Sequence, residues 1–92
     1  MIIIGERING MFKAVNQAIQ DSDKAFIQDL ALKQIAEGAD MLDINVGTAS
    51  AEPQKSMAWL VQSVREVTDV TLSIDNPNLP TMKAGLEACT GL

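Results

Sequence analysis

Acidic and amide side chains stand at or near the ends of three short apolar runs of the chain. The first run leads into Glu6 and Asn9, the second contains Asp43 and Asn45, and the third ends on Asp75. The chain has no histidine and a single cysteine, so the common metal ligands and the commonest general base are missing. Carboxylates, amides and backbone groups must therefore carry any chemistry, and we expect no metal site.

Side chains of this kind suit a neutral ring that is rich in N–H donors. A carboxylate accepts two parallel hydrogen bonds from an aminopyrimidinone edge, as it does from guanine-like or guanidinium groups. Pterins present such an edge. On this argument alone, a phosphorylated sugar or an amino acid stays open as the ligand.

Asp75 and Asp43 differ in their position along the strand. Asp75 is the last residue of its run, and Pro77 turns the chain away directly afterwards, which favours a site residue over a simple cap of the turn. Asp43 lies inside its run and shares a strand face with Asn45, because alternate strand residues point the same way. For Asp43 we expect a structural acid that accepts hydrogen bonds, since a buried carboxylate without partners is costly.

The segment "GERIN" leaves the first strand with two neighbouring charges, Glu6 and Arg7. Adjacent strand residues point to opposite sides, so one of the two should face the site and the other should face away. The alternative is a surface ion pair worth less than about 1 kcal/mol.

The elements that position these residues follow from the spacing of apolar side chains. Strands are predicted over residues 2–4, 41–46 and 70–74, and the first of them should be buried on both faces. Apolar residues at helical spacing predict helices around residues 11–19, 26–35, 57–67 and 82–89. The expected helix starts are Ser22 or Asp23, Pro53 and Asn78, and the expected helix ends are Gly38 and Gly91.

This order of elements predicts three parallel strands joined by right-handed crossovers, with their polar ends at one edge. The turns lack the glycine motifs of nucleotide-binding folds. Polar residues at successive strand ends are typical of the mouth of an α/β (β/α)₈ TIM barrel, which is the predicted fold class. Such a barrel takes roughly 250 residues. We therefore expect residues 1–92 to be the first three βα units of a single barrel domain, a fragment of a longer chain.

Composition narrows the classes of partner. An apolar content of 47% with mixed charges is typical of a soluble globular protein. A net charge of −5 without a basic stripe argues against nucleic acid. No apolar run is long enough to span a bilayer, and no basic start marks a signal peptide. The lone Cys89 fits a reducing cytoplasm, where we expect the protein.

Four segments together carry a family resemblance: "IIIGERINGMF", "LDINVG", "MAWLVQSV" and "SIDNPN…AGLEAC". In this order and spacing they closely resemble the N-terminal part of the methyltetrahydrofolate:corrinoid methyltransferases. This family includes the corrinoid/iron-sulfur protein methyltransferase of acetogens, methyltransferases of O-demethylase systems and the folate module of cobalamin-dependent methionine synthase. The resemblance implies a barrel that binds 5-methyltetrahydrofolate and exchanges its methyl group with the cobalt of a corrinoid on a partner protein. It also implies a homodimer.

The resemblance assigns residues as well. Asp75, Glu6 and Asn9 match family positions that hydrogen-bond the pterin, and Asn45 lies in a motif at the mouth. The further candidates for the pterin site are Asn45, Asp43 and Asn76.

The chain departs from the family in two ways. Where relatives often have Ser or Thr after the acid, this chain has Asn76 and Pro77. The residue thought to assist methyl activation lies on strands beyond Leu92, so we expect no catalytic residue and no methyl transfer by residues 1–92 alone.

Two other functions stay open. A dihydropteroate synthase-like enzyme binds a similar ring, but its opening "N-V-T-P-D-S-F" is absent and its motif after the second strand differs from "DINVG". A non-catalytic half-barrel module would need a second chain to close the sheet. Such a module should form a defined oligomer, whereas a lone fragment should aggregate through its unpaired third strand.

Overall fold

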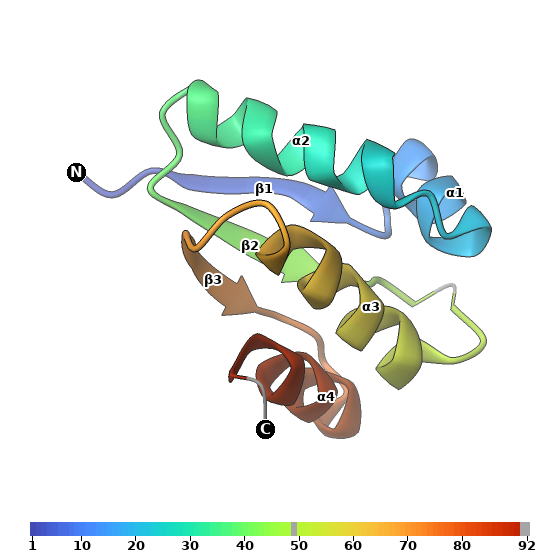
Figure 1. Cartoon of the computed structure of the whole chain (residues 1–92). Coiled ribbons are helices and arrows are strands. Elements are labelled where there is room, and N and C mark those ends of the chain that lie inside the picture. Colours follow the sequence, from blue (N-terminus) through green and yellow to red (C-terminus); the bar gives the residue numbers. More distant parts are fainter. Residues whose placement is uncertain (49, 91–92) are drawn as a thin grey trace.

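The three strands form one parallel sheet in the order β1-β2-β3 in the computed structural model, which describes residues 1–48 and 50–90. The strands are β1 (Ile4–Asn9), β2 (Met41–Asn45) and β3 (Thr71–Ile74). The helices are α1 (Lys13–Asp21), α2 (Lys24–Ala36), α3 (Pro53–Arg65) and α4 (Leu79–Thr90). All three strands point the same way (Figure 1), which confirms the predicted parallel βα units.

Helices cover one face of the sheet, and none of the described helices covers the other, which we call the open face. Leu42 and Ile44 of β2 are fully buried in the core between sheet and helices. The alternate residues Met41, Asp43 and Asn45 remain partly exposed on the opposite face. Of the predicted core stripe, Met57, Leu60, Val61 and Val64 lie in α3 and are 0% exposed, whereas Val67 follows the end of the helix and is half-buried.

The prediction for the first strand was wrong in its bounds and in its burial. Strand β1 begins at Ile4 opposite Met41 and continues through polar residues to Asn9. Ile2, Ile3 and Ile4 are 72%, 48% and 47% exposed. The reason is that β1 pairs only with β2 among the described residues, so the ladder begins where β2 begins and no second neighbour covers the apolar start.

The first helix also begins later than its apolar spacing suggests. Met11 and Phe12 are exposed and precede α1, because Asn9 holds them in a turn. The Met11 N–H donates to Asn9 Oδ1 at 2.9 Å, and the Phe12 N–H donates to the Asn9 carbonyl at 3.0 Å.

The predicted starts of α2, α3 and α4 and the predicted end of α2 are confirmed. Of the two candidates before α2, Asp23 is the cap, and its Oδ1 accepts from the Phe26 N–H at 3.1 Å. Pro53 is the first residue of α3, and Asn78 accepts from the Thr81 N–H ahead of α4. Gly38 follows α2 with a φ of +107°. The predicted stop at Gly91 lies outside the described residues.

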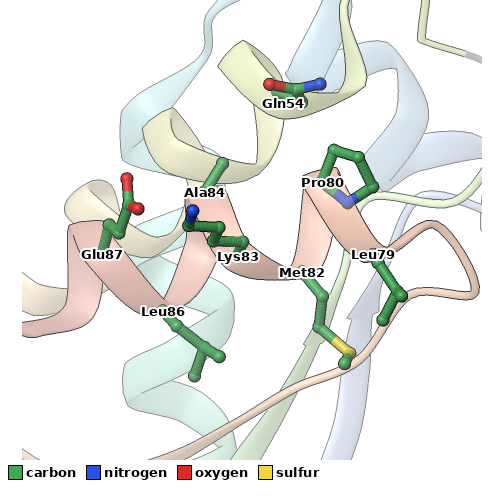
Figure 2. A pocket seen from close by; sticks show the side chains of 8 residues that line it. All are labelled: Gln54, Leu79, Pro80, Met82, Lys83, Ala84, Leu86 and Glu87. Atoms are coloured by element: carbon green, nitrogen blue, oxygen red, sulfur yellow. The ribbon is translucent and has the colours of Figure 1, made fainter.

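Helix α4 packs through small residues, and its large apolar residues face outward. Thr81 and Gly85 are its buried residues, and a Cβ on Gly85 would come within 2.6 Å of Ile74 Cγ2. Leu79 and Leu86 are 72% and 50% exposed, and they project with Met82 from the side of α4 away from α3 (Figure 2). Met82 and Leu86 therefore lie in a helix, as predicted, but they do not form its buried face. Within residues 1–48 and 50–90, no helix has the length and apolar character needed to cross a bilayer.

Candidate functional site at the strand ends

The polar residues at the ends of the three strands lie together on the open face of the sheet. Asn9 and Asn45 are partners across β1 and β2, and Asp43 pairs with Ser73 across β2 and β3. The Asp75 N–H donates to the Ile44 carbonyl at 2.9 Å, which extends the β2–β3 ladder by one residue. This contact places Asp75 beside the end of β2, next to Asn45.

A β-bulge shapes the part of β1 that carries Glu6 and Arg7. Gly5 pairs with Leu42 and Ile8 pairs with Ile44, so both intervening residues stand opposite Asp43 alone. Both charged side chains are exposed. The bulge interrupts the strict alternation behind the expectation that one of these residues faces the site and the other faces away.

Gln34 of α2 holds this bulge. Its side chain is 6% exposed, and its Oε1 accepts from the Arg7 N–H at 3.0 Å. Gly5 leaves room for it, because a Cβ at that position would come within 2.6 Å of Gln34 Oε1. Gln34 was not among the residues predicted from the sequence. The sequence pattern that could have indicated Gln34 is its spacing: it lies on the same helical face as Ile27 and Ala31, where a polar residue is unusual.

The three candidate carboxylates accept no hydrogen bond within the part of the chain that the structure describes. Asp75 and Glu6 are exposed and Asp43 is half-buried. The donors expected around Asp43 are therefore not found among these residues, and Asp75 does not cap the turn that follows it. The two ion pairs among the described residues join Lys24 to Glu66 and Lys55 to Glu52, so the Glu6 carboxylate is not paired there.

The amides, in contrast, are bonded to the backbone in a repeated way. Each strand end carries an asparagine whose Oδ1 accepts from the backbone N–H two residues later, an arrangement known as an Asx turn. The pairs and distances are Asn9 with Met11 at 2.9 Å, Asn45 with Gly47 at 2.8 Å and Asn76 with Asn78 at 3.0 Å. These turns redirect the chain at the same edge of the sheet.

Two glycines bring the first two turns into contact. A Cβ on Gly10 would overlap the Val46 carbonyl oxygen, and a Cβ on Gly47 would come within 2.9 Å of the Gly10 carbonyl carbon. Gly47 also has a φ of +77°, which other residues rarely adopt. This close contact keeps Asn9 and Asn45 next to each other.

Among the hollows of the described chain, two lie along its helices. The larger, about 690 Å³, runs along α4 and the start of α3 and includes Lys83 and Glu87 (Figure 2). The other, about 590 Å³, lies between α1 and the start of α3 beside Trp59. Neither is lined by a strand-end residue, so neither hollow is the candidate site. No group of three or more His, Cys, Asp or Glu residues with metal-binding geometry occurs among residues 1–48 and 50–90.

Comparison with known proteins identifies the family. The family model described as "Pterin binding enzyme" matches residues 10–92. The chain belongs to the pterin-binding enzyme family. It is also 39% identical, over 89 residues, to the methylcorrinoid:tetrahydrofolate methyltransferase of Eubacterium limosum. This match covers 97% of the chain and 33% of the relative, so the chain spans about a third of the relative's length.

The region matched by the family model covers part of the strand-end arrangement. The matched region contains Asn45 and Asp75 together with the turns that follow β2 and β3. Glu6 and Asn9 precede the region matched by the family model.

Proposed function

We propose that residues 1–92 form part of the 5-methyltetrahydrofolate site of a methyltransferase that exchanges methyl groups with the cobalt of a corrinoid protein. The observation that carries this proposal is the 39% identity across 97% of the chain to a protein named for the reaction between a methylcorrinoid and tetrahydrofolate. The pterin-binding family match supports the ligand class.

The strand-end geometry supports a pterin as the ligand. A pterin presents two adjacent donors, its 2-amino group and N3–H, and then an acceptor, its 4-oxo group. The Asp75 carboxylate is exposed and accepts no hydrogen bond from the described residues, so it can accept from both donors. Asn45 lies beside it, with its Oδ1 occupied by the Gly47 N–H, and can donate from its amide nitrogen to the oxygen.

Within this proposal the residues have distinct roles. When a methyl group leaves a tertiary amine nitrogen, positive charge or a proton on that nitrogen makes it a better leaving group. The Asp75 carboxylate contributes electrostatically to stabilising a protonated pterin. Glu6 and Asn9 position the ring so that the methyl group is in line with its acceptor. Asp43, half-buried on the same sheet face, adds negative charge to the site.

The family resemblance extends the proposal to the assembly. We expect a separate corrinoid protein as partner, a homodimeric enzyme and a cytoplasmic location. Two alternatives stay open, a dihydropteroate synthase-like enzyme and a non-catalytic pterin-binding module. The reaction that the protein catalyses, if any, distinguishes them from the proposed methyltransferase.

The test uses the full natural chain, titrated with 5-methyltetrahydrofolate and then assayed for methyl transfer to free cob(I)alamin by visible spectroscopy. We expect binding at micromolar concentrations, equivalent to about 8 kcal/mol, and formation of methylcobalamin. Binding without transfer to free or protein-bound corrinoid would favour the module. Condensation of a pterin diphosphate with p-aminobenzoate would favour the synthase, and absence of pterin binding would refute the proposal.

A further inference from the structure

Asn76 is buried behind the strand ends and connects two of the asparagine turns. Its side chain is 6% exposed, although it follows the exposed Asp75 directly. Its Nδ2 donates to Asn45 Oδ1 at 3.1 Å and to the Gly47 carbonyl at 3.3 Å. Its Oδ1 accepts from the Asn78 N–H at 3.0 Å. Both the nitrogen and the oxygen of the Asn76 amide are therefore hydrogen-bonded within the protein, and the buried side chain is poorly placed to contact a ligand.

Backbone groups fix which way each amide points. The Asn78 N–H can only donate, so the Asn76 oxygen must face it, and the Asn76 nitrogen then faces the Gly47 carbonyl, which can only accept. The Gly47 N–H likewise requires the oxygen of Asn45. The orientations of Asn45 and Asn76 thus follow from unambiguous donors and acceptors at three points of the main chain.

The consequence is a fixed polarity for Asn45. Its Oδ1 receives two hydrogen bonds, from Gly47 and from Asn76, which occupies both lone pairs of the oxygen. Its Nδ2 makes no hydrogen bond among the described residues. Because no buried side-chain nitrogen or oxygen lacks a partner there, this nitrogen reaches solvent on the open face.

We propose that Asn76 is a positioning residue that locks Asn45 with its amide nitrogen toward the ligand, so that this subsite selects a hydrogen-bond acceptor. The proposal rests on the proposed function for the identity of the ligand, a pterin whose 4-oxo oxygen lies beside the edge bound by Asp75. Asn76 acts through Asn45 and does not itself touch the ring. The site then distinguishes the substituent at ring position 4. An oxygen there accepts a hydrogen bond from Asn45 Nδ2, whereas an amino group would place a donor against this donor.

Two substitutions test the lock. Asn76→Asp keeps the acceptor for the Asn78 N–H but places an oxygen opposite Asn45 Oδ1 and the Gly47 carbonyl, which repels the present orientation of Asn45 and leaves the Gly47 N–H alone to favour it. Asn76→Ser removes the amide donor, leaves a hydroxyl on a shorter side chain that is too far from Asn45 to replace it, and avoids the added charge. Asn78→Ser is the matched control, since serine also caps helices and this position makes no contact with Asn45.

The first readout is amide hydrogen exchange of the unliganded full natural chain. Asn76→Ser and Asn76→Asp should accelerate exchange of the Gly47 N–H by about tenfold or more, because its acceptor is no longer held in place. The Met11 N–H is the internal control, since it bonds Asn9 in an equivalent turn without a link to Asn76. Unchanged Gly47 exchange in both variants would overturn the lock, whether or not the protein binds a pterin.

The second readout is ligand selectivity, measured with 5-methyltetrahydrofolate and its 4-amino-4-deoxy analogue. The wild type should bind the 4-oxo ligand more tightly than the 4-amino analogue. Both Asn76 variants should reduce this preference, expressed as the Kd of the 4-amino analogue divided by the Kd of the 4-oxo ligand, by about tenfold, the equivalent of about one hydrogen bond. Asn78→Ser should keep the wild-type ratio. If the variants weaken both ligands equally, Asn76 has only a structural role and the proposal fails. If the wild type binds neither ligand, the proposed function and this pterin selectivity both fail, and Gly47 exchange alone decides the lock.

Discussion

Asn9 and Asn45 are cross-strand partners at the ends of β1 and β2, and each holds the backbone N–H two residues later with its side-chain oxygen. Because the two turns are equivalent, the two amide nitrogens are both left on the open side of the sheet. Asp75 follows β3 beside the end of β2, since its N–H donates to the Ile44 carbonyl. The strand ends thus combine hydrogen-bond donors and a full negative charge, which is the complement of a ring with adjacent donors and acceptors.

Replacing the Asp75 carboxylate should weaken ligand binding with little effect on folding. In Asp75→Asn one strong acceptor becomes a donor that faces the N–H groups of the ring, so we expect the Kd for 5-methyltetrahydrofolate to rise by roughly a hundredfold. The free energy of unfolding should change by less than about 0.5 kcal/mol, because the side chain is exposed and unbonded among the described residues. Calorimetric titration and urea unfolding of the full natural chain provide the measurements.

The matched control is Asp69→Asn, which removes the same charge from an exposed residue before β3. It should leave the Kd within about twofold of the wild type. Equal weakening by both substitutions would mean that net charge, rather than a contact from Asp75, attracts the ligand.

Removing the side-chain acceptor of Gln34 should destabilise the bulge of β1. Gln34→Leu leaves the Arg7 N–H without its partner, and an unpaired amide of this kind costs about 1–3 kcal/mol. Ligand affinity should fall as well, because the bulge sets the position of Glu6. Gln62→Leu, on the exposed side of α3, is the control and should change stability by less than about 0.5 kcal/mol. A Gln34 variant as stable as this control would show that the bulge is held by other contacts.

The elements that depend on local patterns could be predicted from the sequence. Strands β2 and β3 begin or end within one residue of their predicted bounds, since their apolar runs coincide with their pairing. Pro53 and Asn78, and Asp23 as one of two neighbouring candidates, are predictable because helix starts depend on residues within a few positions. The prediction of the bounds of β1 was wrong, because this strand continues through Glu6 and Arg7, whose exposed side chains interrupt the apolar pattern.

The candidate site could be predicted only in part. Right-handed crossovers are enough to place Asn9, Asn45 and Asp75 at one edge of the sheet. Which of their atoms are free to bind a ligand is a different matter, because it depends on contacts between residues far apart in the chain. The hydrogen bond from Asn76 to Asn45 spans 31 residues, and no local pattern in the sequence indicates it.

Adding a methyl group at Gly10 should separate the first two turns of the site. In Gly10→Ala the new Cβ overlaps the Val46 carbonyl oxygen, so the two backbones must move apart, at a cost of about 1–3 kcal/mol for overpacking. We also expect weaker binding of 5-methyltetrahydrofolate, because Asn9 and Asn45 no longer keep their spacing. Ala51→Ser is the control, because it also adds one heavy atom, at an exposed position of the loop before α3, and should leave stability and affinity nearly unchanged. Wild-type stability and affinity in the Gly10 variant would show that the turns are not in firm contact.

The start of α2 should depend on Asp23 more than on any other acid of that helix. Asp23 Oδ1 caps the Phe26 N–H, so Asp23→Ala should lower the free energy of unfolding by about 1 kcal/mol, and Asp23→Ser should restore most of it because serine is also a good cap. Asp29→Ala removes an exposed acid from the body of the same helix and should be nearly neutral.

Urea unfolding, monitored by circular dichroism, measures the stability of all three variants. Equal losses for Asp23→Ala and Asp29→Ala would assign the effect to charge, whereas recovery in Asp23→Ser assigns it to the capping hydrogen bond. Because α2 carries Gln34, a frayed start of this helix should also loosen the bulge of β1.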